Sequence, residues 1–246
     1  MSQFRLVRLS LLLASLGLTG VPALLTAAHA QAPAAAPAAE APKNNVRPEL
    51  YKLLEPGAFK QLMDAKKFPE LQEKIAAAEA VPNRTPYENY SIDRMKLAVA
   101  SVSGNEPMIL STLEAVLAST YLTPKERDDF TQVLAGKYYE AKNYTKAVEV
   151  AKRYQKESTT PEKLSALLTR SYYLGGDYAS AKTELGPVVA AAEAKGQAPS
   201  KEDLGLLATS AMKVKDDATY ISTMQRMVTY YPTDEYWTDL LSRMQR

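Results

Sequence analysis

The sequence predicts an all-α fold that is built as an array of repeated helix pairs. Prolines recur at Pro48, Pro86, Pro124 and Pro161, with spacings of 38, 38 and 37 residues. No strand-like alternation of apolar and polar residues separates these positions. Self-similarity at a fixed period of roughly 20 to 50 residues is typical of repeat architectures. We therefore expect an α-solenoid of about five helix pairs.

Three of these prolines lie in near-identical helix starts, with the sequences TPYE at 85–88, TPKE at 123–126 and TPE at 160–162. In each, the threonine can accept a hydrogen bond from a free backbone amide, and proline suits the first helical position. Glu88 and Glu126 stand three residues after their threonines and complete a capping box. The stretches SKED at 200–203 and TDE at 233–235 continue the pattern without proline.

Residues 1–30 have the composition of a secretory signal peptide. Arg5 and Arg8 precede an apolar run that begins at Leu9, and small residues surround a predicted cleavage point after Ala30. The alternative is a retained anchor, because the run from Leu9 is long enough to cross a bilayer. The alanine-rich end favours cleavage.

Residues 31–45 consist mainly of alanine and proline, with few charges and no large apolar side chain. Such a segment cannot bury enough surface to offset the entropy of ordering it, so we predict a flexible tether. Residues 46–246 are then the predicted helical repeat domain, which is long enough for a continuous core.

Composition argues against most enzyme chemistry and against nucleic-acid binding. The chain carries 30 basic and 28 acidic residues, and removing Arg5 and Arg8 with the signal leaves 28 of each. A chain with no net charge has no long-range electrostatic field that attracts nucleic acid. His29, the single histidine, is lost with the signal, and there is no cysteine. We therefore predict no catalytic residue, no metal site and no cofactor.

Two patterns in the sequence have a weak resemblance to catalytic sites. Ser210 and Lys213 have the S-x-x-K spacing of periplasmic acyl-enzymes, but no S-D-N or K-T-G companion follows. An enzyme could also rely on carboxylates alone, as glycosidases do. The acidic pairs at 128–129 and 216–217 are adjacent in sequence, so both members cannot face one pocket on a regular helix. We expect caps and solvated charges there.

The repeat is clearest when residues 134–147 are aligned with residues 168–181. Short turns at 141–144 and 175–178 separate two helices in each segment, whereas the pairs predicted at 48–82, 85–120 and 200–232 are more degenerate. Small residues in such pairs stand where helices cross closely. The matching positions are Leu134, Tyr138, Tyr139, Tyr144 and Ala147 in the first segment and Leu168, Tyr172, Tyr173, Tyr178 and Ala181 in the second.

These positions resemble the tetratricopeptide repeat. The sequence LAGKYY at 134–139, followed by Asn143, Tyr144 and Ala147, is similar to the family signature L-A/G-x-x-Y … G-x-Y-x-x-A. Thr169 departs from it at a small-residue position, and no tryptophan lies near the start of either first helix. The resemblance implies a right-handed α-solenoid of about five tetratricopeptide-like helix pairs, whose first helices line a concave groove.

Two features near the C-terminus complete the predicted array. Pro187 follows Gly186 inside a second helix, which it should kink or end early. Residues 233–246 are predicted to form a C-terminal capping helix, because the last pair would otherwise expose an apolar face. Its predicted apolar face consists of Tyr236, Trp237, Leu240 and Leu241.

The groove geometry of the resembling family selects the candidate partner-binding residues. Aromatic and arginine side chains are common anchors of interfaces, so Tyr139, Arg170 and Tyr173 are the main candidates. The alternative is that both tyrosines pack between repeats and that Arg170 is a solvated charge. The predicted set is Asp129, Gln132 and Tyr139 in one pair, Lys163, Arg170 and Tyr173 in the next, and Glu202, Thr209 and Met212 in the last.

The chain also resembles periplasmic tetratricopeptide proteins of Gram-negative bacteria that accompany TonB energy-transduction components. The signal, the tether, Phe68, the tyrosines of the two clear turns and the closing YYP at 230–232 carry this resemblance. It implies a periplasmic, non-enzymatic scaffold for a protein or peptide partner of the cell envelope, such as a TonB-system component, with no membrane span after cleavage. The alternative is a structural or assembly factor for outer-membrane or cell-wall machinery.

The signal interpretation gives a direct prediction. Mass spectrometry of the protein recovered from a Gram-negative host should find Gln31 as the first residue, because the peptidase cuts after Ala30. A chain that keeps residues 1–30 would instead support the retained anchor.

Overall fold

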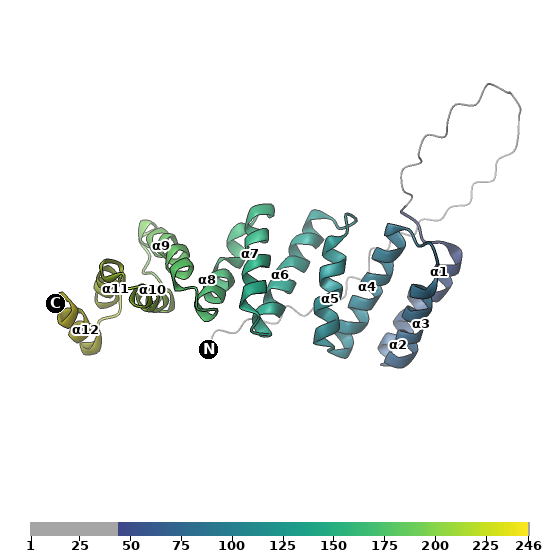
Figure 1. Ribbon diagram of the computed structural model, residues 1–246, viewed down its shortest axis with the longest axis horizontal. Helices are drawn as coiled ribbons and strands as arrows, with labels where there is room; N and C mark the ends of the chain where they lie inside the picture. Colours follow the sequence, from purple (N-terminus) through teal and green to yellow (C-terminus); the bar gives the residue numbers. More distant parts are fainter. Residues whose placement is uncertain (1–43, 246) are drawn as a thin grey trace, which may run out of the picture. The chain divides into compact units, whose positions relative to one another are not determined.

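The computed structural model describes residues 44–245, in which every regular element is a helix (Figure 1). The predicted all-α class is therefore confirmed for this range. The predicted signal at 1–30, and the tether at 31–45 up to residue 43, lie outside the described residues. The chain divides after Leu122 into two compact units, which are described separately.

Within residues 44–122, the first unit contains five helices, each of which packs on a neighbour in sequence or close to it. Proline at the first helical position removes an amide that would have no partner, which favours the starts of α1, α2 and α4. The core is formed mainly by Leu50, Phe59, Leu71, Ile75 and Ile92. The bounds are α1 Pro48–Leu53, α2 Pro56–Asp64, α3 Phe68–Ala80, α4 Pro86–Ser103 and α5 Glu106–Ala118.

The first predicted pair contains one more helix than expected. Pro56 separates α1 from α2, because the residue before a proline is disfavoured in helical conformation. The carboxylate of Glu55 then caps α2 by accepting hydrogen bonds from the amides of Gly57 and Ala58, at 2.9 and 2.6 Å. α1 packs on α3, so it belongs to the same core as the pair α2–α3.

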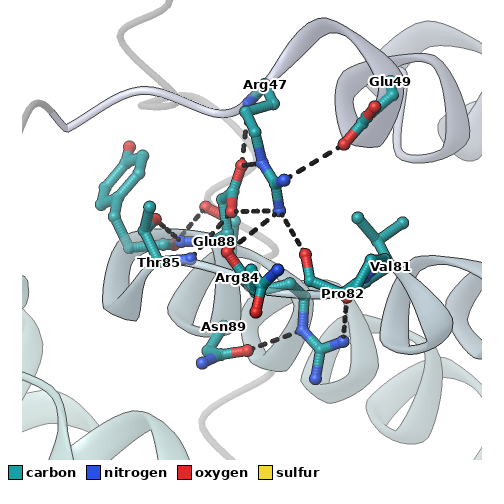
Figure 2. A network of polar contacts seen from close by, with 11 residues as sticks. Arg47, Glu49, Val81, Pro82, Arg84, Thr85, Glu88 and Asn89 are labelled. Carbon is teal, nitrogen blue, oxygen red and sulfur yellow. Dashed lines mark hydrogen bonds and ion pairs between the residues drawn. The ribbon is translucent and has the colours of Figure 1, made fainter.

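An ion pair with a buried carboxylate joins the start of α1 to the start of α4 (Figure 2). The Glu88 side chain is fully buried, and its carboxylate accepts hydrogen bonds from Arg47 Nε at 2.8 Å, Arg47 Nη2 at 3.0 Å and the Arg47 amide at 3.0 Å. The Thr85 amide donates to the same carboxylate at 2.8 Å, and the Thr85 hydroxyl accepts from the Glu88 amide. The predicted capping box is confirmed, and Arg47 is its unforeseen partner.

The same arginine reaches the segment that ends the preceding helix. Arg47 Nη2 donates to the carbonyl of Pro82 at 3.1 Å, and Arg84 Nη1 donates to the carbonyl of Val81 at 2.7 Å. Arg47 thus joins the start of α1 both to the connection between α3 and α4 and to the start of α4. The hydrogen bond from Arg47 is the main cause that lowers the pKa of Glu88 to about 2.

The second unit contains three helix pairs and a last helix. Each helix packs against the next, within pairs and between them, as the repeat prediction requires. Its elements are α6 Pro124–Glu140, α7 Tyr144–Glu157, the 3-10 helix η1 Pro161–Leu164, α8 Ser165–Leu174, α9 Tyr178–Ala194, α10 Lys201–Lys213, α11 Asp217–Tyr230 and α12 Asp234–Met244.

One predicted helix start in this unit is wrong in its details. Thr123 caps α6 in a complete capping box, but Thr160 makes no side-chain cap, and Pro161 opens the 3-10 helix η1. The hydroxyl of Thr160 is instead hydrogen-bonded to the Tyr154 hydroxyl at 2.9 Å. The residue three positions after Thr160 is Lys163, whereas a capping box needs a glutamate or glutamine there. The first α-helix of this pair, α8, therefore begins only at Ser165.

The turns between first and second helices repeat one structure. Lys142, Gly176 and Lys215 occupy the left-handed region with φ of 57, 84 and 59°. The residue that follows each of them caps the second helix through its side-chain oxygen. These caps are Asn143 to the amide of Lys146, Asp177 to that of Ser180 and Asp216 to that of Thr219, at 3.2, 3.0 and 3.0 Å.

Pro187 does not end its helix. The sequence left open a kink or an early end, and α9 continues past this residue to Ala194. Pro187 is exposed, so its ring points away from the packed side of the helix.

The ion pair between Arg47 and Glu88 in the first unit can be tested by Glu88→Gln. This change removes a charge whose hydrogen bonds are charge-assisted, and we expect a loss of about 2 kcal/mol in the free energy of unfolding at pH 7. Urea titration of the full chain measures it.

The same variant should change the pH dependence of stability. The pKa of Glu88 lies near 4.5 when unfolded and at about 2 when folded. The ionised bridge therefore stabilises the fold above pH 4.5, and this contribution is lost as the pH falls towards 2. The stability difference between the wild type and Glu88→Gln should shrink across that range. A difference that is independent of pH would contradict this account.

Candidate partner-binding surface

Fully buried alanines set how closely the helices of the second unit approach. Ala135, Ala147, Ala181 and Ala211 have no exposed surface. Small side chains at such positions allow two helix backbones to cross with dense packing. Successive first helices α6, α8 and α10 consequently present equivalent residues at regular intervals, and we call their exposed residues the first-helix surface.

The structure pairs two of the predicted site residues and places a third within electrostatic range of them, with one residue on each first helix. Arg170 on α8 forms an ion pair with Glu202 on α10, with Nη2 and Nε at 2.8 and 2.9 Å from the same carboxylate oxygen. Tyr139 on α6 lies within electrostatic range of both charges. Partial burial raises the pKa of the Tyr139 phenol, and the positive charge of Arg170 opposes that shift.

The predicted tyrosines are half-buried and pack against tyrosines of the second helices. Tyr139 meets Tyr144 edge-on with ring centres 5.7 Å apart, and Tyr173 meets Tyr178 edge-on at 5.5 Å. Such contacts stabilise each turn by about 1 kcal/mol beyond the area that they bury. Both tyrosines therefore have a packing role and also keep part of their surface in solvent.

Each second-helix tyrosine also touches the next pair. A Cβ atom on Gly175 would lie 3.3 Å from the Cβ of Tyr144 and 2.9 Å from the carbonyl oxygen of Ser171, so this turn requires glycine. One pair further on, the ammonium group of Lys213 lies 5.9 Å from the ring centre of Tyr178, within cation–π range. These contacts keep the first helices in register.

The other predicted residues have separate surroundings. The Gln132 amide donates to the Tyr154 hydroxyl at 3.1 Å and so fastens α7 to α6. Asp129 pairs with Lys125 at 2.5 Å, about three turns of α6 away from Tyr139. Lys163 is exposed on η1, Thr209 is half-buried on α10, and Met212 is 41 % exposed at the position equivalent to Tyr173.

The S-x-x-K pattern does not form a reactive pair. Ser210 is fully buried in α10, where no substrate can reach its hydroxyl, and that oxygen has no hydrogen-bond partner among the described residues. Lys213 lies over the Tyr178 ring instead. Within residues 44–245, no three acidic or histidine side chains gather as a metal site would require. None of the helices in that range has the length and apolar character that a bilayer-crossing helix needs.

Two ionic contacts that sequence reasoning missed join α9 to α11 and its cap. Lys182 on α9 pairs at 2.5 Å with Asp216, the cap of α11, and this hydrogen bond lowers the pKa of Asp216 well below its usual range. Arg226 on α11 pairs with Glu193 on α9 at 2.9 Å. The sequence predicts that Asp216 caps a helix. No local pattern indicates that Lys182, 34 residues away, is its ionic partner.

No protein-family model and no curated protein matches the chain. Among solved structures, a crystal structure of nearly identical TPR-like repeats of a kinesin light chain from Podosopora anserina is similar to it. The identity is 16%, the match covers 75% of this chain and 97% of that one, and the TM-score is 0.40. Because this TM-score is low, the assignment of helix pairs rests on the packing between the helices of this chain.

The ion pair of the cluster should contribute little to stability. Because the Glu202 side chain is about half exposed, we expect Arg170→Gln or Glu202→Gln to lower the free energy of unfolding by less than about 1 kcal/mol. Thermal unfolding of each variant measures this change. A loss of several kcal/mol would instead assign the pair to the core of the unit.

Proposed function

We propose that the chain is an exported, non-enzymatic scaffold that binds a peptide or protein partner on the first-helix surface of residues 123–245. The observation that carries this proposal is the ion pair between Arg170 and Glu202, which lies within electrostatic range of Tyr139, so that three successive first helices contribute to one cluster. Tyrosine and arginine are the residue types that most often anchor interfaces.

The surface has the repetition that suits an elongated partner. Tyr139, Tyr173 and Met212 occupy equivalent positions on α6, α8 and α10, and each keeps part of its side chain in solvent. Neighbouring first helices of closely packed pairs lie roughly 10 Å apart, which is about one three-residue turn of a peptide in polyproline II conformation. A partner with an apolar side chain at every third position could contact all three.

Glycines on the same helices leave room for a partner backbone. A Cβ atom on Gly136 or on Gly205 would meet nothing within 4 Å apart from its own helix. These open positions lie one turn before Tyr139 on α6 and one turn after the start of α10. Open space at Gly136, one turn from Tyr139, supports the recognition of a peptide on this surface.

We further propose that the partner belongs to the cell envelope and that the protein works in the periplasm. The predicted signal at 1–30 and the tether at 31–45 support export, and the resemblance to TonB-associated tetratricopeptide proteins suggests an accessory role in TonB-dependent transport. A structural or assembly role in outer-membrane or cell-wall machinery is the second candidate. The exposed apolar residues of α12 favour it, because they offer a contact outside the first-helix surface.

The proposal predicts that one combined variant loses its partner. Tyr139→Ala, Arg170→Ala and Tyr173→Ala together should reduce the partner recovered by crosslinking and affinity capture from envelope extracts at least tenfold. The readout is quantitative mass spectrometry of the captured proteins, with the TonB-system proteins scored separately.

A matched control carries three alanine substitutions at exposed positions of the second helices, namely Lys152, Val188 and Gln225. This control should capture the partner as the wild type does, and both variants should remain folded by circular dichroism. Unchanged capture by the first variant would refute the first-helix surface. Loss of fold would assign its tyrosines to packing.

A further inference from the structure

The last helix of the second unit exposes a continuous apolar stripe. Trp237, Leu241 and Met244 on α12 are 47, 53 and 59 % exposed. Their spacing of four and three residues places all three on one face of the helix. A capping helix should present a polar outer face to solvent, so this stripe departs from that role.

A different face of α12 holds it against α11. Leu240 is 3 % exposed, and the Tyr220 hydroxyl donates a hydrogen bond to Asp239. The guanidinium of Arg243 lies 4.7 Å from the ring centre of Tyr220 and 3.6 Å from the carboxylate of Asp217. Burial and the bond to Asp239 raise the pKa of Tyr220 to about 12. α12 is thus firmly docked, and its exposed stripe is not the result of a loose helix end.

The repeat offset identifies the residues of α10 that are equivalent to the stripe on α12. Ser200 caps α10 and Thr233 caps α12, and these caps are 33 residues apart. At that offset, Trp237, Leu241 and Met244 match Leu204, Ala208 and Ala211 on α10, which are 0, 7 and 0 % exposed. The α10 residues share one core cluster with Tyr220, Met224, Met227 and Val228 of α11, the second helix of their pair.

We infer that the stripe on α12 is a docking site for an amphipathic helix of a partner protein, seated as α11 sits on α10. The stripe continues, by repeat equivalence, an interface that the unit already uses three times, in α6–α7, α8–α9 and α10–α11. By this equivalence α12 matches the first helix of a pair, and the partner's helix takes the position that α11 has on α10.

The size of the stripe residues specifies where the partner helix needs small side chains. Leu241 and Met244 stand where α10 has alanines, so the incoming helix needs small residues where α11 has the large Tyr220. α7 has this character, because Ala147 and Ala151 are both fully buried at its crossing with α6. The partner helix therefore carries alanine or glycine at two positions four residues apart.

Contacts in the existing pairs specify the direction of the partner helix, and charge specifies the residues of its last turn. In the existing pairs, the end of the second helix lies beside the start of the first: the Ser158 hydroxyl donates to Asp128 at 2.6 Å, and the Tyr231 hydroxyl donates to the Pro199 carbonyl at 2.9 Å. The first turn of α12 is acidic, with Asp234 and Glu235 exposed. The partner helix consequently ends in lysine or arginine, which also suits its dipole.

The probe for this proposal is a synthetic peptide with the sequence of residues 143–158. It has the two alanines and a basic C-terminal part in Lys152, Arg153 and Lys156. Trp237 is the chain's single tryptophan, so its emission reports the stripe directly. Titrating the peptide into the full chain should shift the emission to shorter wavelength, in a saturable manner, as the indole leaves water.

Two matched controls decide the outcome. Leu241→Asp should weaken the peptide at least tenfold without unfolding the protein, because this side chain is half exposed, whereas Gln225→Asp on α11 should bind as the wild type does. An emission that does not change up to millimolar peptide overturns the proposal. So does a shift that Leu241→Asp leaves intact, or a dimer, detected by sedimentation, in which a second copy already covers Trp237.

Discussion

The close crossing of helices at buried alanines is the constraint on which the rest of the second unit depends. With Ala135, Ala147, Ala181 and Ala211 fully buried, each first helix lies close to its neighbours, and equivalent side chains recur from pair to pair. The tyrosines of the turns then reach the next pair, as Tyr144 does at Gly175. The cluster that links Tyr139 to Arg170 and Glu202 requires this register, because its members lie on three different helices.

Local signals predicted the helix pairs well, because caps and turns are encoded within a few residues. Thr85 and Thr123 cap their helices as expected, whereas Thr160 does not, since its hydroxyl is engaged by Tyr154. Nothing local indicates that Arg47 bonds to Glu88, 41 residues away. Long-range polar contacts of this kind depend on which segments the packing brings together, and one sequence does not reveal that.

The candidate site could be predicted only in part for the same reason. The repeat placed Tyr139, Arg170 and Glu202 on first helices, and the structure pairs Arg170 with Glu202. It assigns Gln132 to the junction of α6 and α7. For α12 the predicted helix is present and Leu240 is buried, whereas Trp237 and Leu241 of the predicted apolar face keep about half of their surface in solvent. A capping helix and the first helix of a pair share the same apolar residues, and only the exposure of Trp237 and Leu241 distinguishes them.

The central claim is that a partner binds the first-helix surface, and site-specific photo-crosslinking tests it most directly. A photoreactive amino acid in place of Met212, on α10, should give a discrete adduct in living cells, because this exposed side chain belongs to the surface. The same group in place of Gln225, on α11, should give none. Adducts from position 225 alone, or equal adducts from both positions, would contradict the account.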